Sequence, residues 1–357
     1  MDETPVFRIF GLGGAGGRIA DAVSSRTGGR LSGFAVDTDS AALGSLECCR
    51  RLLVGQSRFS GLGSGGDVSA AHVSAQEARA ALARELEDVC AAVVVAGLGG
   101  GTGSGALPVL LRLADERNVP TLVVAVSPFG MEGTERVRAA GAALRACEGL
   151  GTARILLSND DLAPPSRETT LEEAFARATD VAAAALSLLW KMTALRGYVN
   201  LSPADVVQLL RNGRGTVDFG WAVARGPQRF SEAVDALWNQ PGLGLAPKTA
   251  GAKAALACVL GGPDLRLVEV GDAAAAVSAM LPFGTPVSLA TVVDPDAAGS
   301  FELALLLFRH WSEPGAVADP AAAPTAGRFV RTPATVVDGE NLDQPTYERR
   351  RIHIDAD

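Results

Sequence analysis

Cysteine and histidine are scarce in this chain of 357 residues, and their placement excludes several kinds of site. The five cysteines are Cys48, Cys49, Cys90, Cys147 and Cys258. Their number is odd and their spacing is not that of a metal site, so we expect reduced, buried thiols. The three histidines, at positions 72, 310 and 353, are too scattered to suggest a histidine metal site or a catalytic triad.

Long apolar runs and excess positive charge are also missing. No apolar run reaches the roughly 18 residues that a membrane span needs, and the N-terminus has no basic-then-apolar signal segment. The net charge of -8 argues against nonspecific binding to nucleic acid. We therefore expect a cytoplasmic protein that neither inserts into a membrane nor binds nucleic acid, and that is long enough for two domains.

Glycine, by contrast, is concentrated, most densely at residues 99–105, which read Gly-Gly-Gly-Thr-Gly-Ser-Gly. An apolar run at 92–96 predicts a buried strand before them, and we expect a helix after them with Pro108 in its first turn. Glycines let backbone N–H groups approach a ligand, and a helix start adds unpaired N–H groups. The stretch therefore predicts an anion site, most often for phosphate, to which the hydroxyls of Thr102 and Ser104 can add donors. No lysine follows, so this is not the common P-loop, and a turn without a ligand would not need five glycines.

Two further glycine loops, at 11–17 and 61–66, also follow apolar strands. Strands at 6–10, 33–36, 52–54, 92–96, 120–126 and 155–157 alternate with helices, one of which we expect from a Ser74 cap to Cys90. This alternation predicts a parallel sheet with ligands at the carboxyl ends of its strands. The first loop with Asp37 also mimics a dinucleotide fingerprint, so a nicotinamide-dependent dehydrogenase is an alternative. Three glycine loops on one sheet favour a single triphosphate instead.

The second half of the chain predicts another α/β region. Residues 171–195 form a helix that is apolar nearly all round in its second half, as in a buried spine between two domains. We then expect helices at 203–210, 231–238 and 273–280, the last capped by Asp272, and strands at 254–260, 265–270, 286–293 and 301–308. A Pro/Ala-rich linker and a charged end follow.

The glycine-rich stretch at 99–105 resembles the signature loop of the tubulin and FtsZ superfamily, and the chain is similar to bacterial FtsZ along nearly its whole length. The resemblance implies an α/β fold with a Rossmann-like parallel-sheet GTPase domain, a long central helix and a second α/β domain with a mixed sheet. The implied boundaries are a GTP-binding domain at 1–170, the central helix at 171–196, an activation domain at 197–311, a flexible linker at 312–339 and a partner-binding peptide at 340–357.

The same resemblance implies a GTP or GDP site. The residues it places there are Gly13, Gly14, Ala15, Gly16, Asp39, Gly65, Gly66, Gly99, Gly100, Gly101, Thr102, Gly103, Ser104, Glu132, Arg136, Asn159, Phe175 and Asp180. Glu132 would accept hydrogen bonds from ribose hydroxyls and Arg136 would meet phosphate. Phe175 would stack on the base and Asp180 would accept from the guanine N1–H and N2–H₂, which adenine lacks. A helix-start Glu132, a surface Arg136 and a core Phe175 are the plainer interpretations.

Three departures from the family pattern lie in this region. Arg18 stands where the family has Asn, and it would touch a phosphate or be solvated. Asp37-Thr38-Asp39 resembles the family's Asn-Thr-Asp. Asp39 would hold Mg²⁺ through water, or cap the next helix, so no residue is assigned as a direct metal ligand. Residues 67–69, Asp-Val-Ser, replace Asn-Pro-Glu near the terminal phosphate.

Residues 200–205 resemble the family's catalytic loop, Asn-x-Asp-x-x-Asp, which one subunit inserts into the nucleotide pocket of the next. Asn200 and Asp205 are present, but Ser202 replaces the first Asp. A serine is a poor base, so we expect slow hydrolysis, since a general base contributes roughly 10²–10⁴-fold. Ser202 and Asp205 also fit a helix-capping pair.

Residues 341–351 are similar to the family's C-terminal peptide, with Leu342, Pro345 and Tyr347 as apolar anchors. The alternative is a solvated charged end. The function implied is a GTP-binding, filament-forming division protein that assembles head-to-tail, acts as a ring or septum scaffold at the division site, hydrolyses GTP at the subunit interface and binds tethers through its tail. A scaffold that binds GTP without hydrolysing it is the alternative that Ser202 favours.

Overall fold

The computed structural model describes residues 6–29, 31–151, 153–163, 168–194, 201–239, 244–311, 336–337 and 340–341. The chain divides into two units, Met1–Pro314 and Gly315–Asp357, which are described separately. In the second unit, β11 (Val336–Val337) pairs antiparallel with β12 (Glu340–Asn341). Leu342, Pro345 and Tyr347 of the predicted tail peptide lie outside the described residues.

One sheet of ten strands, in the order β3-β2-β1-β4-β5-β6-β7-β10-β8-β9, runs through the first unit. The seven strands from β3 to β7 pair in parallel, β10 is antiparallel to both of its neighbours, and β8 and β9 are again parallel. The expected combination of a parallel first half and a mixed second half is therefore confirmed. The strands are β1 (Val6–Leu12), β2 (Ser32–Asp37), β3 (Arg50–Leu53), β4 (Val89–Gly97), β5 (Thr121–Ser127), β6 (Ala153–Ser158), β7 (Gly215–Arg225), β8 (Ala254–Gly261), β9 (Val287–Val293) and β10 (Ser300–Phe308).

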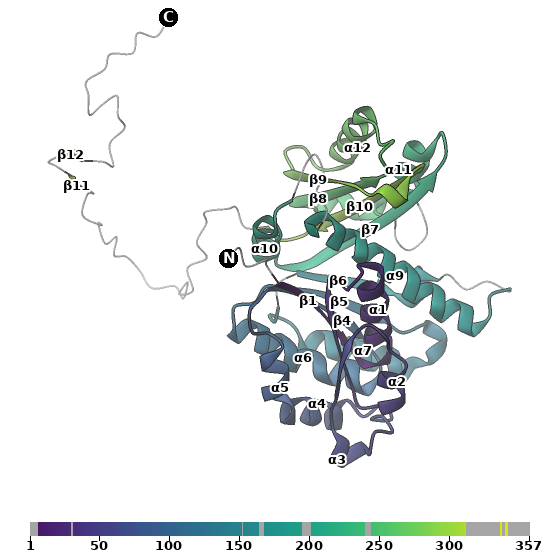
Figure 1. The fold of residues 1–357 in the computed structure, drawn as a ribbon, viewed down its shortest axis with the longest axis vertical. Helices are drawn as coiled ribbons and strands as arrows, with labels where there is room; N and C mark the ends of the chain where they lie inside the picture. The colour runs from purple at the N-terminus through teal and green to yellow at the C-terminus, as the bar shows by residue number, and fades with distance from the viewer. Residues whose placement is uncertain are drawn as a thin grey trace, which may run out of the picture. The chain divides into compact units, whose positions relative to one another are not determined.

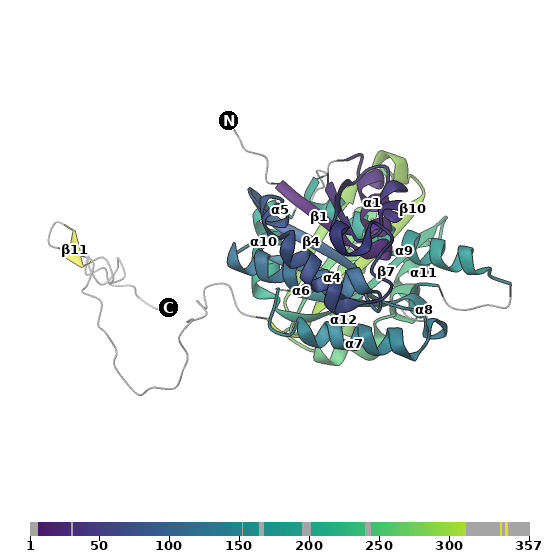
Figure 2. The same cartoon turned by 90° about the horizontal axis from the view of Figure 1, so that it is seen from below.

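Helices cover both faces of the parallel half, which explains why its strands are apolar on both sides (Figures 1 and 2). Alternate strand residues separate the two cores: Ile9 packs with the α1 and α9 side, whereas Phe10 packs with the α6 side. The helices in the first half are α1 (Gly13–Arg26), α2 (Ser40–Gly44), α3 (Gln56–Phe59), α4 (Val68–Glu77), α5 (Arg79–Arg84), α6 (Gly101–Glu116), α7 (Thr134–Ala146) and α8 (Asn159–Leu162), with the short 3₁₀ turn η1 (Gly130–Glu132) before α7.

Helix α9 (Leu171–Ala194) joins the two halves of the sheet, as its apolar sequence predicts (Figure 1). It packs against α1 and shares one core with Leu256, Leu306 and other residues of the mixed half. The opposite face of that half is covered by α11 (Arg229–Asn239) and α12 (Leu267–Met280), which form a core of their own. The remaining elements of this half are α10 (Pro203–Asn212), η2 (Ala246–Gly251) and η3 (Pro295–Ala297).

Two helix starts in the first half differ from expectation. The helix expected from Ser74 to Cys90 begins at Val68, because the Asp67 side chain accepts from the Ala70 N–H at 2.8 Å and is the better cap. It breaks after Glu77, and Cys90 lies in β4. Pro108 is not in the first turn of its helix, because the glycines from Gly101 on are themselves helical and place it well inside α6.

Two predictions in the second half are also wrong. Residues 265–270 are not a strand, because α12 already begins at Leu267, where Glu269 accepts from the Arg266 N–H at 2.9 Å as part of a capping box. Asp272 is therefore inside the helix rather than at its cap. Strand β7 was not predicted, because its polar and apolar residues alternate too weakly to stand out.

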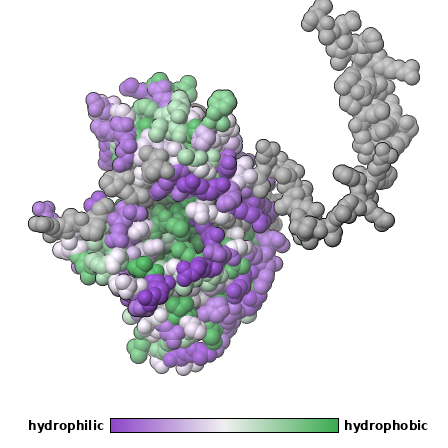
Figure 3. Space-filling model, turned by 180° about the vertical axis from the view of Figure 1, so that it is seen from behind, coloured by the Kyte–Doolittle hydropathy of each residue, from purple (hydrophilic) through white to green (hydrophobic). Residues whose placement is uncertain are grey.

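The surface is mixed, with a hydrophobic area near the centre of the face seen from behind and hydrophilic residues around it (Figure 3). Cys48 and Cys90 are exposed, so the expectation of buried thiols holds only for Cys49, Cys147 and Cys258, and all five are free. None of the helices in the described ranges is both long and apolar enough to cross a bilayer.

Candidate functional site

A polar hollow of about 440 Å³ lies at the carboxyl ends of the parallel strands. Its wall includes residues at or just after the ends of β1, β2, β4, β5 and β6, which bring segments far apart in the sequence together. All three glycine loops contribute to it. The predicted site residues that line it are Gly13, Gly14, Ala15, Asp39, Gly65, Gly66, Gly100, Gly101, Thr102, Gly103, Glu132, Arg136, Asn159 and Phe175.

The three loops pack closely against one another. A Cβ on Gly103 would lie 2.0 Å from the Gly97 carbonyl oxygen, and one on Gly13, whose φ is +72°, would lie 2.9 Å from the Gly103 amide nitrogen. A Cβ on Gly101 would lie 2.1 Å from the Ser64 hydroxyl oxygen of the middle loop. No side chain larger than hydrogen fits at these contacts, so the glycines let α1 and α6 start side by side at the hollow. Two helix N-termini then present unpaired N–H groups to the same space.

Three predicted residues support the loops without lining the hollow. A Cβ on Gly16 would lie 2.4 Å from the Val95 carbonyl oxygen, so this glycine allows α1 to pack closely on β4. The Ser104 hydroxyl oxygen accepts from the Gly99 N–H at 3.0 Å and closes the third loop on itself. Gly99 also packs closely against α7, because a Cβ added to it would lie 2.7 Å from the Arg136 carbonyl oxygen.

A buried polar network that we did not predict from the sequence forms part of the wall. Asp37, at the end of β2, is 6% exposed, and its Oδ1 accepts from the Thr38 N–H at 2.7 Å and the Thr102 hydroxyl at 2.9 Å. Thr38 and Thr102 share a further hydrogen bond of 2.8 Å between their hydroxyls. Because the Thr102 proton goes to Asp37, this hydroxyl is committed to the protein. Burial raises the pKa of the Asp37 carboxyl, although these hydrogen bonds act in the opposite direction.

Asp39 acts as the cap of α2. Its Oδ1 accepts from the Ala41 N–H at 2.8 Å and the Ala42 N–H at 3.1 Å, so the capping alternative is present in the structure. The middle glycine loop is tied to the same segment, because the Gly63 N–H donates to the Thr38 carbonyl at 3.1 Å. Asp39 also lines the hollow, so capping leaves its role toward Mg²⁺ open. Within the ranges that the structure describes, no three His, Cys, Asp or Glu side chains cluster as direct metal ligands.

Glu132 and Arg136 meet at the wall of the hollow. The Glu132 Oε1 accepts from the Phe129 N–H at 2.8 Å, and its Oε2 accepts from Arg136 Nη1 at 2.5 Å. The Glu132 side chain is 14% exposed and that of Arg136 is 58% exposed. The glutamate is thus held in place and the guanidinium keeps free edges toward solvent and the hollow.

Two of the three predicted base-binding residues line the hollow, and the third does not. Asn159, at the start of α8, is buried and lines the hollow. Phe175 of α9 also lines it and packs edge-to-face on Phe129, with 5.0 Å between the two ring centroids. Asp180 does not line the hollow. It is exposed, and its Oδ1 lies 3.1 Å from Arg26 Nη2 of α1.

The two predicted catalytic residues are Asn200 and Asp205. Asn200 is outside the described residues. Asp205 is in the first turn of α10, where its Oδ2 accepts from the Ser202 N–H at 2.8 Å and the Ser202 hydroxyl at 2.7 Å. The Ser202 hydroxyl in turn accepts from the Asp205 N–H at 3.2 Å, which completes a capping box. These bonds hold the pKa of Asp205 below its usual value, so the carboxylate is charged but weakly basic.

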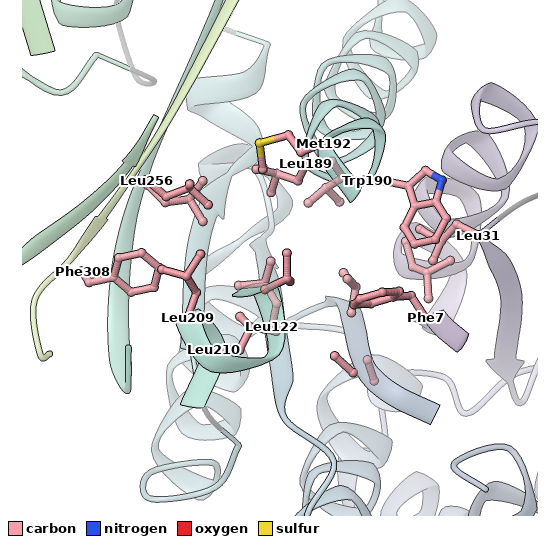
Figure 4. Close-up of a pocket in the computed structure, with 17 residues that line it drawn as sticks. Phe7, Leu31, Leu122, Leu189, Trp190, Met192, Leu209, Leu210, Leu256 and Phe308 are labelled. Atoms are coloured by element: carbon pink, nitrogen blue, oxygen red, sulfur yellow. The ribbon is translucent and has the colours of Figure 1, made fainter. Parts of the chain in front are cut away.

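Helix α10 packs at the opposite end of the strands from the polar hollow. Its residues Val206, Leu209 and Leu210 line a second, apolar cavity of about 70 Å³, together with Phe7 near the start of β1 and Leu122 near the start of β5 (Figure 4). Since the hollow begins beyond the last residue of β1 and a strand rises about 3.3 Å per residue, the two ends are roughly 20 Å apart.

Comparison with known proteins gives one answer. Residues 7–164 match the family described as Tubulin/FtsZ family, GTPase domain. Cell division protein FtsZ from Pseudomonas putida is 27% identical over 367 residues, which span 100% of this chain and 92% of the relative. Cell division protein FtsZ from Rickettsia bellii is 32% identical over 274 residues, or 76% of this chain and 59% of the relative.

Solved structures agree. The empty FtsZ dimer of M. jannaschii superposes with a TM-score of 0.80 at 26% identity, over 86% of this chain and 89% of that one. CetZ2 from Haloferax volcanii, solved as a GTPgS-bound protofilament, gives a TM-score of 0.69 at 26% identity, over 85% of this chain and 92% of that one. These matches leave no support for the dehydrogenase alternative, which the first glycine loop alone had suggested.

Proposed function

Because this chain belongs to the tubulin/FtsZ GTPase family, we propose that it binds GTP and GDP, assembles head-to-tail into filaments and hydrolyses GTP slowly at the subunit interface. Its setting would be the cytoplasm at the site of cell division, where the filaments act as a ring or septum scaffold. The relatives named cell division protein FtsZ support this setting.

The observation that carries the proposal is the polar hollow with three interlocked glycine loops around it. A triphosphate carries several negative charges within a few ångströms, and backbone N–H groups at two helix starts are suited to such an anion. Glu132 would accept from ribose hydroxyls, and Phe175 and Asn159 would contact the base. Mg²⁺ would supply charge neutralisation on the phosphates, with Asp39 contacting its waters.

Guanine selection requires a rearrangement of one ion pair. Asp180 would accept from the base N–H groups only after leaving Arg26, a partner that is itself 43% exposed and 3.1 Å away. An exposed ion pair contributes about 0–1 kcal/mol, so a nucleotide can displace it at small cost. The proposed preference for guanine over adenine then follows from the unpaired carboxylate that adenine would leave.

The position of Asp205 supports a composite active site. Because α10 and the hollow lie at opposite ends of the same strands, Asp205 cannot reach the nucleotide of its own chain, whereas a head-to-tail neighbour would bring it there. Such contacts do not close on themselves and therefore form filaments. Hydrolysis should then depend on assembly.

Phosphate release and light scattering, measured together across a range of protein concentrations with GTP and Mg²⁺, test this. We expect both signals to rise steeply above a threshold concentration. A constant activity per molecule from dilute to concentrated protein would contradict the composite site.

A scaffold that binds GTP without hydrolysing it is favoured by one specific observation. Ser202 stands where the family has a catalytic Asp, and it engages the Asp205 carboxylate through both its N–H and its hydroxyl. Ser202→Asp should raise turnover about 10²-fold or more if the rest of the site is competent, because a general base contributes roughly 10²–10⁴-fold. Asp205→Asn is the matched control, which should remove what activity remains. Unchanged turnover in Ser202→Asp would favour the scaffold.

The tail at 341–351 is proposed to bind division tethers, and it has no described side chains. A fluorescent fusion that lacks residues 341–357 should still form filaments in vitro but should leave the division site in cells. Normal localisation of this fusion would remove the tail from the proposal.

A further inference from the structure

Arg18 is a cation in the wall of the polar hollow. It lies in α1, one turn after Gly14, and it is exposed at the wall of the hollow. Two arginines nearby are paired, Arg26 with Asp180 and Arg136 with Glu132. In the part of the chain that the structure describes, Arg18 forms no hydrogen bond or ion pair. Its guanidinium is therefore available to a ligand.

The two carboxylate oxygens of Asp37 differ in their hydrogen bonding. Its Oδ1 accepts from Thr38 N–H, Asp39 N–H and the Thr102 hydroxyl. Its Oδ2 points instead toward the first turn of α1. A Cβ built on Gly14 would lie 3.9 Å from Asp37 Oδ2 and 3.5 Å from Arg18 Nη1, so the two atoms flank the same point of the backbone.

A buried carboxylate beside a phosphate site would repel the phosphate unless a cation lies between them. Two anions in a partly desolvated space repel each other, and Asp37 cannot move away because three donors hold it. Gly14 belongs to the first turn of α1, where helix N–H groups favour a phosphate. Arg18 reaches this corner and, unlike a point charge, offers several N–H donors in a planar fork.

We propose that Arg18 is a phosphate-binding residue of this chain, its guanidinium bridging Asp37 Oδ2 and the nucleotide phosphate that lies at the start of α1. The inference rests on the proposed GTP site. Arg18 and Asp37 act as a unit, because Asp37 is compatible with a phosphate only when Arg18 lies between them. The bridge supplies part of the charge neutralisation that Mg²⁺ would otherwise provide, so nucleotide affinity depends less on Mg²⁺ than it would without Arg18.

The test is calorimetric binding of GTP, GDP and guanosine to the full chain, in excess Mg²⁺ and in excess EDTA. Arg18→Gln should weaken GTP binding about tenfold or more in EDTA, the range for a hydrogen bond between charged groups, and less in Mg²⁺. Guanosine affinity should not change, since it has no phosphate. Arg58→Gln, at an exposed arginine that pairs with Glu77 and does not line the hollow, is the matched control and should bind like the wild type.

Asp37→Asn keeps the acceptor oxygen for the three donors and removes the charge, so it tests the coupling. Combined with Arg18→Gln it should recover GTP affinity in EDTA to within about threefold of the wild type, because the repulsion is gone. Circular dichroism of each variant checks that it is folded.

Two outcomes would overturn the bridge: Arg18→Gln binding GTP in EDTA within twofold of the wild type, or losing guanosine and GTP affinity equally, which would place Arg18 on the base. A double variant no better than Arg18→Gln alone would overturn the coupling to Asp37. Failure of the wild type itself to bind GTP in Mg²⁺ would instead defeat the proposed function, so the two failures are distinguishable.

Discussion

The same parallel strands end in two different cavities. At their carboxyl ends lies the polar hollow of about 440 Å³, with glycines, Asp37 and two helix starts in its wall. Toward their amino ends lies the apolar cavity of about 70 Å³ beneath α10, which is lined by side chains such as Phe7, Trp190 and Leu210 (Figure 4).

The difference lies in what makes each wall. In the polar hollow, glycines without side chains bring backbone groups to the surface. A single added Cβ, such as one on Gly103 at 2.0 Å from the Gly97 carbonyl oxygen, would therefore disturb the wall. In the apolar cavity the wall consists of hydrocarbon, so only the volume of each side chain matters. The first end is suited to an anion, as the proposed function requires. The second end contributes stability and supports the helix that carries Asp205.

The largest effect is expected from Gly103→Ala, which adds a Cβ between backbone atoms that cannot move apart. The variant should lose GTP affinity by at least about 100-fold and lose roughly 1–3 kcal/mol of unfolding free energy through overpacking. Calorimetry and urea unfolding measure the two effects. Gly271→Ala, in α12 with nothing within 4 Å of the new Cβ, is the control and should be neutral or slightly stabilising. Full GTP affinity in Gly103→Ala would mean that the loops are not closely packed.

Leu210→Ala tests the apolar end. Removing a side chain that is 7% exposed beside an existing cavity should cost about 2–4 kcal/mol of unfolding free energy and leave the GTP affinity of the monomer unchanged. Leu267→Ala, at a leucine that is 88% exposed, should cost less than about 0.5 kcal/mol in the same urea experiment. A large loss of GTP affinity in Leu210→Ala would show that the two ends are coupled.

Ser202→Ala removes the cap of α10 and should cost about 1 kcal/mol at neutral pH. Ser202 holds the pKa of Asp205 below its usual value in the folded protein. Stability of that kind is present above the unfolded-state pKa of about 4 and is lost as the pH falls through the lower folded value. The difference between the variant and the wild type should therefore shrink in urea titrations below about pH 4. Ser278→Ala, exposed inside α12, is the control, and an equal loss there would contradict the capping role.

The smallest effect should come from Val206→Ile, which adds one methyl group to the wall of the apolar cavity. We expect a gain of at most about 0.8 kcal/mol in thermal or urea unfolding, the contribution of one buried CH₂. Val268→Ile on the exposed face of α12 should change nothing measurable. Destabilisation by Val206→Ile would show that the cavity is filled in solution by movement of α10.

Much of the fold and of the polar hollow could be predicted from the sequence. Alternating apolar runs and helices predict the parallel sheet, because strands buried on both faces must be apolar. The glycine density at 99–105 predicts an anion site, because only glycine allows so close a backbone approach. The resemblance then placed fourteen of the predicted residues around what proved to be one hollow.

Helix starts and long-range polar contacts were harder to predict from the sequence. Asp67 rather than Ser74 begins α4, and Glu269 rather than Asp272 helps begin α12, because several residues in each segment can cap a helix and packing decides among them. Asp180 carries a recognisable spacing from Phe175, yet its ion pair with Arg26 depends on how α1 and α9 pack.

By itself, the sequence determined the strands of the parallel half from β1 to β6 and the positions of the three glycine-rich loops, because hydrophobic period and glycine content are local properties. Only the tertiary structure decided that Asp37, Thr102 and Arg18 share one corner, and that Asp205 lies at the far end of the strands, held by Ser202. The physical reason is that contacts between residues far apart in the chain depend on how the helices pack across the sheet, and no local pattern encodes that distance.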